Sequence, residues 1–228
     1  LSSLELTPLD TRDPELAYLF KHILTQEVAY TTLPFATRGL LHGQIGQYIE
    51  RSYADTIEQY TDLLAYHYDN SDNLPKRREY LLKAGALAQA DYNNLAAQSY
   101  YERLLPLLAE PERGELLLRL GQVLEVIGQW PEADARYREA LALAEQLGDR
   151  PAQAQAQALI GELLRKQGQY AQALTWLEQA HASYTRLGER AGVAQALHFL
   201  GSLDIQQGSY DQAIEHYAAS LAIRRELG

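Results

Sequence analysis

Hydrophobic and polar positions follow a helical period along most of the chain, and in the second half the pattern itself repeats. Between residues 117 and 228, three blocks follow one another at a spacing of 40 residues. Each block has two apolar-periodic segments of about four turns, separated by Gly128, Gly168 or Gly208. Because glycine readily adopts the left-handed conformation that ends a helix, we expect a helix pair in each block. Self-similarity at a fixed period predicts a solenoid of stacked pairs.

Each block also carries small residues where two helices must approach closely. A glycine lies in the middle of each first helix, at Gly121, Gly161 and Gly201. Glycine there costs about 1 kcal/mol relative to alanine, and the close approach of a second helix can offset this cost. The second helix has alanine at the matching position in all three blocks, which are Ala133, Ala173 and Ala213. We therefore expect small residues to face one another in tight antiparallel pairs.

The spacing of these positions resembles the tetratricopeptide repeat (TPR) family. The shared features are a Leu-Gly or Ile-Gly pair in the first helix, the alanine of the second helix, and a Leu-Gly ending. A further one is the mid-block glycine followed two residues later by Trp130, Tyr170 or Tyr210. The period exceeds the usual 34 residues, so the blocks look like the lengthened variety of kinesin light chains and some bacterial regulators. The resemblance implies an all-α, right-handed TPR-like helical-hairpin solenoid (an α-α superhelix).

One position breaks the repeat. Asp204 stands where the other two blocks carry Leu124 and Leu164. We expect the helix to be rotated there, so that Asp204 faces solvent. The alternative is a buried carboxylate with a partner, which would place Asp204 near the groove of the solenoid as a specificity residue.

The N-terminal region follows a different pattern. Residues 3–7 alternate between apolar and polar, as a strand does, and residues 16–20 are suited to the return strand of a small hairpin. Residues 18–30 (YLFKHILTQEVAY) resemble bacterial predicted ATPases of the signal-transducing (STAND) class, at the end of their winged-helix part. The similarity is strongest to versions fused to class III adenylate or guanylate cyclases.

This second resemblance implies a role for His22. In the STAND class a histidine at this place senses the β-phosphate of the bound nucleotide. The aspartate that usually follows is replaced by Ile23 here, so the match is partial, and the alternative is a histidine that holds its own helix end. No G-x-x-x-x-G-K-[ST] phosphate loop occurs in the chain, so a sensor role for His22 would belong to a longer parent protein.

The sequence therefore predicts three regions. Residues 1–33 would be the winged-helix remnant, residues 34–110 degenerate helical hairpins, and residues 111–228 three long repeats. The chain begins with leucine and contains no methionine, so we expect it to be a piece of a longer polypeptide. Further repeats are expected after Gly228, since the last helix would otherwise present an apolar face. That uncapped face also makes a homo-oligomer an open alternative.

Composition excludes several classes of function. The chain of 228 residues has 20 basic and 30 acidic side chains and a net charge of −10, which disfavours a nucleic-acid partner. It has no cysteine, none of its six histidines lies three or four residues from another, and no nucleophile elbow occurs. We therefore expect no enzyme activity, cofactor or metal in this chain. No apolar run reaches the ~20 residues of a membrane span, and the cytoplasm is the expected location.

A solenoid of this kind has a concave groove lined by the first helices of its repeats, and that groove is the expected site. Arg165 and Lys166, beside Gln122 and Gln206, are predicted to hold a carboxylate of a protein or peptide ligand. The candidate groove residues, chosen by their position in the repeat, are Arg119, Gln122, Glu125, Val126, Gln155, Ala158, Glu162, Arg165, Lys166, Gln195, His198, Phe199, Ser202 and Gln206.

The function that these patterns favour is a non-catalytic protein–protein interaction arm. The resemblance to STAND ATPases implies that it regulates the rest of its own polypeptide, an ATPase fused to a nucleotide cyclase. Two alternatives remain open, which are the arm of a STAND-type transcription activator and a free-standing scaffold or self-association module.

Overall fold

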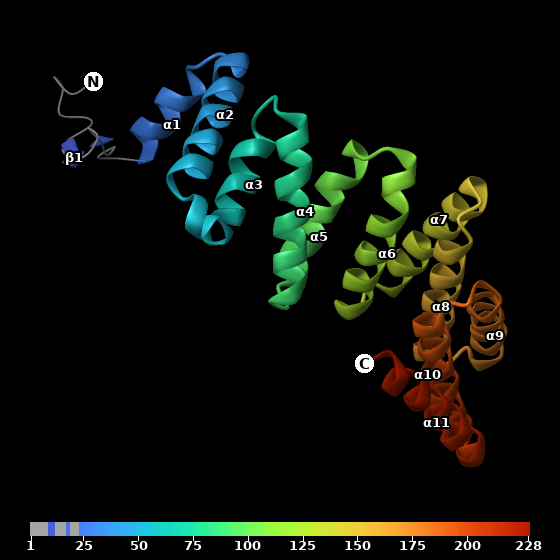
Figure 1. Ribbon diagram of the computed structural model, residues 1–228. Helices are drawn as coiled ribbons and strands as arrows, with labels where there is room; N and C mark the ends of the chain where they lie inside the picture. Colours follow the sequence, from blue (N-terminus) through green and yellow to red (C-terminus); the bar gives the residue numbers. More distant parts are fainter. Residues whose placement is uncertain (1–8, 12–16, 19–22) are drawn as a thin grey trace. The chain divides into compact units, whose positions relative to one another are not determined.

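The computed structural model of this chain describes residues 9–11, 17–18 and 23–228, with side chains from residue 27 onward (Figure 1). His22 and residues 3–7 lie outside the described residues. The N-terminal strands are β1 (Leu9–Thr11) and β2 (Ala17–Tyr18), an antiparallel pair in which Leu9 faces Tyr18. The predicted return strand at 16–20 thus includes β2.

Helices and the short turns between them make up the rest of the described chain. The helices up to residue 107 are α1 (Ile23–Thr31), α2 (Phe35–Ser52), η2 (Ala54–Tyr60, 3-10), α3 (Thr61–Asp69), α4 (Leu74–Ala90), α5 (Asn94–Leu104) and η3 (Leu105–Leu107, 3-10). Three long pairs follow, made of α6 (Glu110–Val126) with α7 (Trp130–Leu147), α8 (Arg150–Lys166) with α9 (Tyr170–Leu187), and α10 (Arg190–Gln207) with α11 (Tyr210–Leu227).

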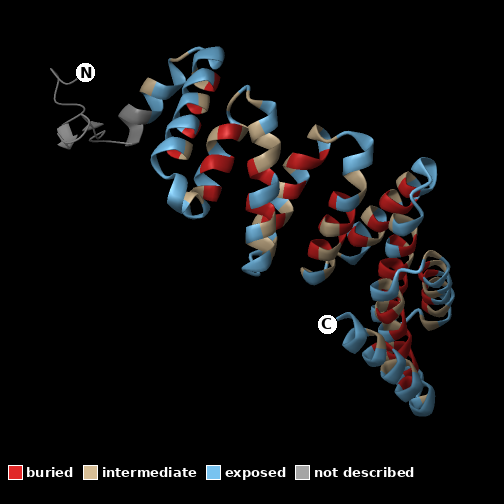
Figure 2. Ribbon diagram, in the orientation of Figure 1, coloured by how far each residue is buried: buried red, intermediate tan, exposed pale blue. Residues whose placement is uncertain are grey.

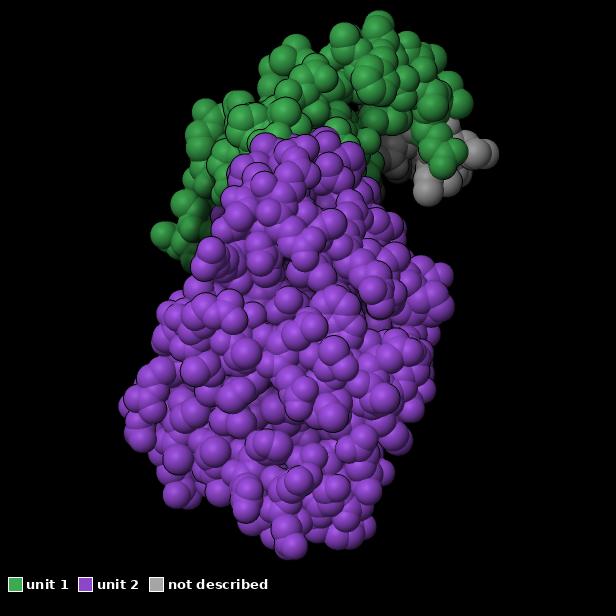
Figure 3. Space-filling view, turned by 90° about the vertical axis from the view of Figure 1, so that its right-hand side faces the viewer, with its two compact units in different colours: residues 1–80 green, residues 81–228 purple. Residues whose placement is uncertain are grey.

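The chain divides into two compact units, Leu1–Tyr80 and Leu81–Gly228 (Figure 3). In the first unit, α2 packs against α3 at Gly46, where an added Cβ would lie 2.7 Å from the ring of Tyr68. The Tyr68 hydroxyl donates to Glu50 Oε2 at 2.7 Å, and Tyr80 donates to Glu50 Oε1 at 2.7 Å. Lys76 Nζ completes this cluster 2.8 Å from Glu50 Oε1.

In each long pair of the second unit, the first helix ends where the glycines predict. Gly128, Gly168 and Gly208 have φ angles of 81°, 77° and 79°, the left-handed region that few other residues tolerate. Asp149 begins α8 by accepting a hydrogen bond from the Ala152 amide at 3.0 Å, as a helix N-cap does. The expected helical-hairpin solenoid is confirmed.

Within the helix pairs, the side chain that faces the glycine of the first helix is not the expected alanine. The space above Gly121 is filled by the ring of Tyr137 rather than by Ala133, and an added Cβ would lie 2.3 Å from that ring. Gly161 makes room for Leu177 in the same way. The glycine of the first helix therefore accommodates a large side chain four residues beyond the alanine, which is itself buried.

A large apolar core runs through the pairs of the second unit (Figure 2), and a smaller apolar cluster lies among α8, α9 and α10. Leu117, Leu120, Ile160, Leu163 and Leu203 are almost wholly buried in it. The second helix of each pair packs against the first helix of the next, since α7 contacts α8 and α9 contacts α10. The first helices also contact one another, α6 with α8 and α8 with α10. This inner row of α6, α8 and α10 carries the candidate site.

Candidate binding groove

A hollow of about 460 Å³ lies along the inner row of helices, within the second unit. It reaches from the α4–α5 corner across α6 and α8 to α10, so every helix pair of the unit contributes to it. Its lining residues are Gln89, Tyr92, Asn94, Gln122, Val123, Glu125, Val126, Leu159, Glu162, Lys166, Gln195 and Phe199.

The structure brings seven of the predicted groove residues together at this hollow. They are Gln122, Glu125, Val126, Glu162, Lys166, Gln195 and Phe199. The α4–α5 corner also lines the hollow, which the repeat pattern did not predict, and Tyr92 there is 86% exposed. A signal for this corner exists in the sequence, since Tyr92-Asn93-Asn94 interrupts a helical pattern. The structure shows a sharp turn there, in which Tyr92 has a φ of 58°.

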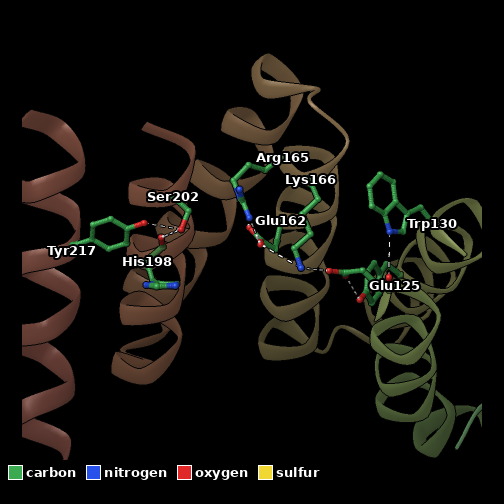
Figure 4. Close-up of polar contacts among 9 residues, drawn as sticks. Glu125, Trp130, Glu162, Arg165, Lys166, His198, Ser202 and Tyr217 are labelled. Carbon is green, nitrogen blue, oxygen red and sulfur yellow. Dashed lines mark hydrogen bonds and ion pairs between the residues drawn. The ribbon is translucent and has the colours of Figure 1, made fainter. Parts of the chain in front are cut away.

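Four charged side chains form a network at the hollow (Figure 4). Arg165 donates from Nε and Nη2 to the two carboxylate oxygens of Glu162, each at 2.7 Å. Lys166 binds Glu125 Oε1 on the neighbouring helix, and its Nζ lies 3.7 Å from Glu162 Oε1. The network therefore joins α8 to α6 and balances two carboxylates with two cations.

The two carboxylates of the network are nearly buried, and this burial strengthens their ion pairs and hydrogen bonds. The side chains of Glu125 and Glu162 are only 11% and 10% exposed, whereas that of Lys166 is 41% exposed. The Tyr137 hydroxyl donates to Glu125 Oε2 at 2.9 Å, and burial together with Glu125 raises the pKa of Tyr137 far above its ordinary value. The hydrogen bond to Glu162 raises the pKa of Arg165. Tyr137 thus stays a neutral donor and Arg165 a permanent cation.

The remaining predicted residues have other surroundings. Arg119 pairs with Glu115, with Nη2 2.7 Å from Oε1, and Gln155 lines a second hollow of about 490 Å³ near the start of α8. Ser202 contacts the Tyr217 hydroxyl at 2.9 Å, and the His198 and Tyr217 rings lie 5.3 Å apart (Figure 4). Gln206 is exposed at the end of α10, and Ala158, expected in the groove, is buried.

The expectation that Asp204 faces solvent is wrong. Asp204 is 6% exposed, and its Oδ2 lies 2.6 Å from His216 Nδ1 on α11. The buried carboxylate is tolerated because the imidazole supplies a hydrogen-bond partner. Asp204 is held between α10 and α11 and is not part of the hollow's lining.

The first unit contains a histidine pair that sequence spacing did not reveal. His42 Nδ1 on α2 lies 2.9 Å from His67 Nδ1 on α3, and the Tyr30 hydroxyl is 3.0 Å from His42 Nε2. Burial lowers the pKa of both imidazoles, and the charge of His42 lowers that of His67 further. Within the described part of the chain, no group of three or more histidine and carboxylate side chains could hold a metal ion.

Sequence comparison places the repeats in a known family. The tetratricopeptide repeat pattern matches residues 112–186 and, in an overlapping match, residues 154–226. The chain belongs to the tetratricopeptide repeat family. The comparison with curated proteins found no match. Among the described residues of this TPR chain, no helix is long and apolar enough to span a bilayer.

Solved structures share the TPR fold at low sequence identity. Aspartyl phosphate phosphatase F from Bacillus subtilis is 15% identical with a TM-score of 0.66, over 90% of this chain and 55% of its own. A Rap protein complexed with competence and sporulation factor is 18% identical with a TM-score of 0.62, over 89% and 58%. A putative kinesin light chain from Podospora anserina is 16% identical with a TM-score of 0.60, over 86% and 98%. The chain spans little more than half of the first two proteins.

Proposed function

We propose that this chain is a non-catalytic recognition arm that binds an extended protein segment along α6, α8 and α10. The observation that carries the proposal is the hollow, which is lined by amide and apolar side chains from successive helix pairs. Amide groups can pair with the backbone of an extended ligand, whereas Val126 and Phe199 offer apolar contact. The Rap protein of similar fold was solved with competence and sporulation factor bound, which supports the same use here.

The resemblance of residues 18–30 to STAND ATPases supports a proposal about the parent polypeptide. We propose that the parent polypeptide is a STAND-type ATPase, fused to a nucleotide cyclase, in which residues 1–33 end the ATPase part and His22 senses nucleotide. Ligand binding to the repeats at 111–228 would then shift the equilibrium between the states of the ATPase. Residues 34–110 would connect the two as degenerate hairpins.

A matched pair of variants tests the recognition role. Random dodecapeptides displayed on phage are selected against the protein, and a synthetic copy of an enriched peptide is titrated by fluorescence polarisation. Gln122→Ala with Gln195→Ala should weaken binding about tenfold, because both amides line the hollow. Gln172→Ala with Gln179→Ala removes two exposed amides of α9 and should leave the affinity unchanged. Equal losses in both variants, or no enriched peptide, would refute the proposal.

A further inference from the structure

The charge network has one member that differs from the others. Glu125 and Glu162 are nearly buried, and Arg165 is held by both oxygens of Glu162. Lys166 is the most exposed of the four and reaches from α8 to Glu125 on α6. Its ammonium group lies at the hollow, between the two carboxylates (Figure 4).

Lys166 is also the member that can leave most easily. A lysine side chain loses rotational freedom when it is held in one geometry. Because the Lys166 side chain is 41% exposed, water can solvate its ammonium group once it leaves Glu125. The buried carboxylates, by contrast, need a cation in place, because an unpaired charge in a partly desolvated site is strongly unfavourable. The site therefore requires a positive charge beside Glu125, and Lys166 need not supply it.

This difference between the buried carboxylates and the exposed lysine indicates the charge that a preferred ligand should carry. An anionic ligand would have to draw Lys166 away and leave Glu125 with the hydroxyl of Tyr137 alone. A cationic ligand can take the place of Lys166 and release its side chain to solvent, so that both carboxylates stay paired. Electrostatic complementarity at the hollow thus favours a basic ligand, in contrast to the carboxylate ligand that Arg165 and Lys166 suggest in the sequence.

The surroundings of the network indicate what else the ligand carries. Tyr92 and Val126 line the same hollow and are 86% and 69% exposed, so they offer apolar area that a ligand can cover. We propose that the groove binds an extended peptide segment whose lysine or arginine side chain displaces Lys166 between Glu125 and Glu162, next to an apolar side chain. This inference rests on the proposed recognition function and specifies its ligand.

The experiment uses the whole chain and a random dodecapeptide library displayed on phage. Enriched peptides should share a lysine or arginine at one aligned position, and replacing that residue by glutamine in the synthetic peptide should weaken binding tenfold or more. Lys166→Ala should raise the affinity for the basic peptide several-fold, because it removes the competing ammonium group. Lys83→Ala, an exposed lysine of α4 outside the hollow, should change nothing. Thermal melting confirms that each variant is folded.

Three results would overturn the inference, and they separate it from the recognition function. Enriched peptides that carry aspartate or glutamate, with affinity lost in Lys166→Ala, would show that Lys166 holds an anion. Enriched peptides whose binding is indifferent to charge would leave the groove a binding site but remove the basic ligand. The absence of any enriched peptide would refute both the ligand and the recognition function. The glutamine exchange is made in the peptide, so it stays informative even if a protein variant fails to fold.

Discussion

At the scale of single residues, the three repeats provide an internal comparison for Asp204. In the third repeat, Asp204 is paired with His216, which lies twelve residues later in the chain. The second repeat has Leu164 and Trp176 at the two equivalent positions. The third repeat therefore replaces an apolar pair by a polar one at the same place. Replacing a buried polar or ionic pair by apolar groups of similar shape is often neutral or stabilising, whereas removing one partner is not.

This comparison leads to a prediction for the last helix pair. His216→Ala should lower the free energy of unfolding by about 2 kcal/mol, because Asp204 would remain buried without its partner. The double change Asp204→Leu with His216→Trp introduces the pair of the second repeat and should recover most of this loss. Urea denaturation measures both variants. A double variant as unstable as His216→Ala would show that the two sites differ in more than this pair.

The sequence could predict residue positions better than residue partners. The 40-residue period places Gln122, Glu162 and Ser202 at equivalent positions of successive first helices. It cannot say that Lys166 pairs with Glu125, because that contact joins side chains 41 residues apart and depends on rotamers. The Asp204–His216 pair was missed for the same reason. A pattern of apolar positions indicates which face is buried but not which polar group has found a partner there.

At the scale of elements, the glycines in the middle of α6 and α10 differ in the room they leave. An added Cβ at Gly121 would lie 2.3 Å from the ring of Tyr137, but at Gly201 it would lie 3.1 Å from the ring of Tyr217. Tyr137 is fully buried and donates to Glu125, so it has little freedom to move. The two helix pairs should therefore respond differently to the same substitution.

Two matched variants test this difference. Overpacking a core costs typically about 1–3 kcal/mol, whereas glycine to alanine within a helix gains about 1 kcal/mol. Gly121→Ala should then be destabilised by up to about 2 kcal/mol, since the close Tyr137 ring puts the overpacking cost at the upper end of this range and above the gain. Gly201→Ala should be close to neutral, since the Tyr217 ring need give only a few tenths of an ångström. Similar unfolding free energies for the two variants would contradict this account of the packing.

Elements outside the regular repeats were harder to predict. The helix pairs from α6 onward follow from their period, and the glycine positions correctly mark where their first helices end. The α4–α5 corner has no such period, so its contribution to the hollow was not foreseen. The contact between His42 and His67 joins α2 to α3 through tertiary packing, and spacing along a single helix could not reveal it.

At the scale of the whole molecule, we propose that recognition belongs to the unit Leu81–Gly228. Its core is continuous from α4 to α10, and its inner helices contact one another in sequence order. A ligand along that row would touch several repeats at once, so affinity would come from many modest contacts. The family and fold follow from the sequence and the structure, whereas the ligand is proposed from the chemistry of the hollow.

The most direct test of this central claim is to map the ligand on the protein. Backbone amide chemical shifts of the labelled protein would be followed by NMR during titration with the peptide enriched from the dodecapeptide library. We expect the largest changes on α6, α8 and α10, around Gln122, Glu162 and Gln195, with little change on the exposed faces of α7 and α9. Largest changes on those outer helices, or within Leu1–Tyr80, would contradict it.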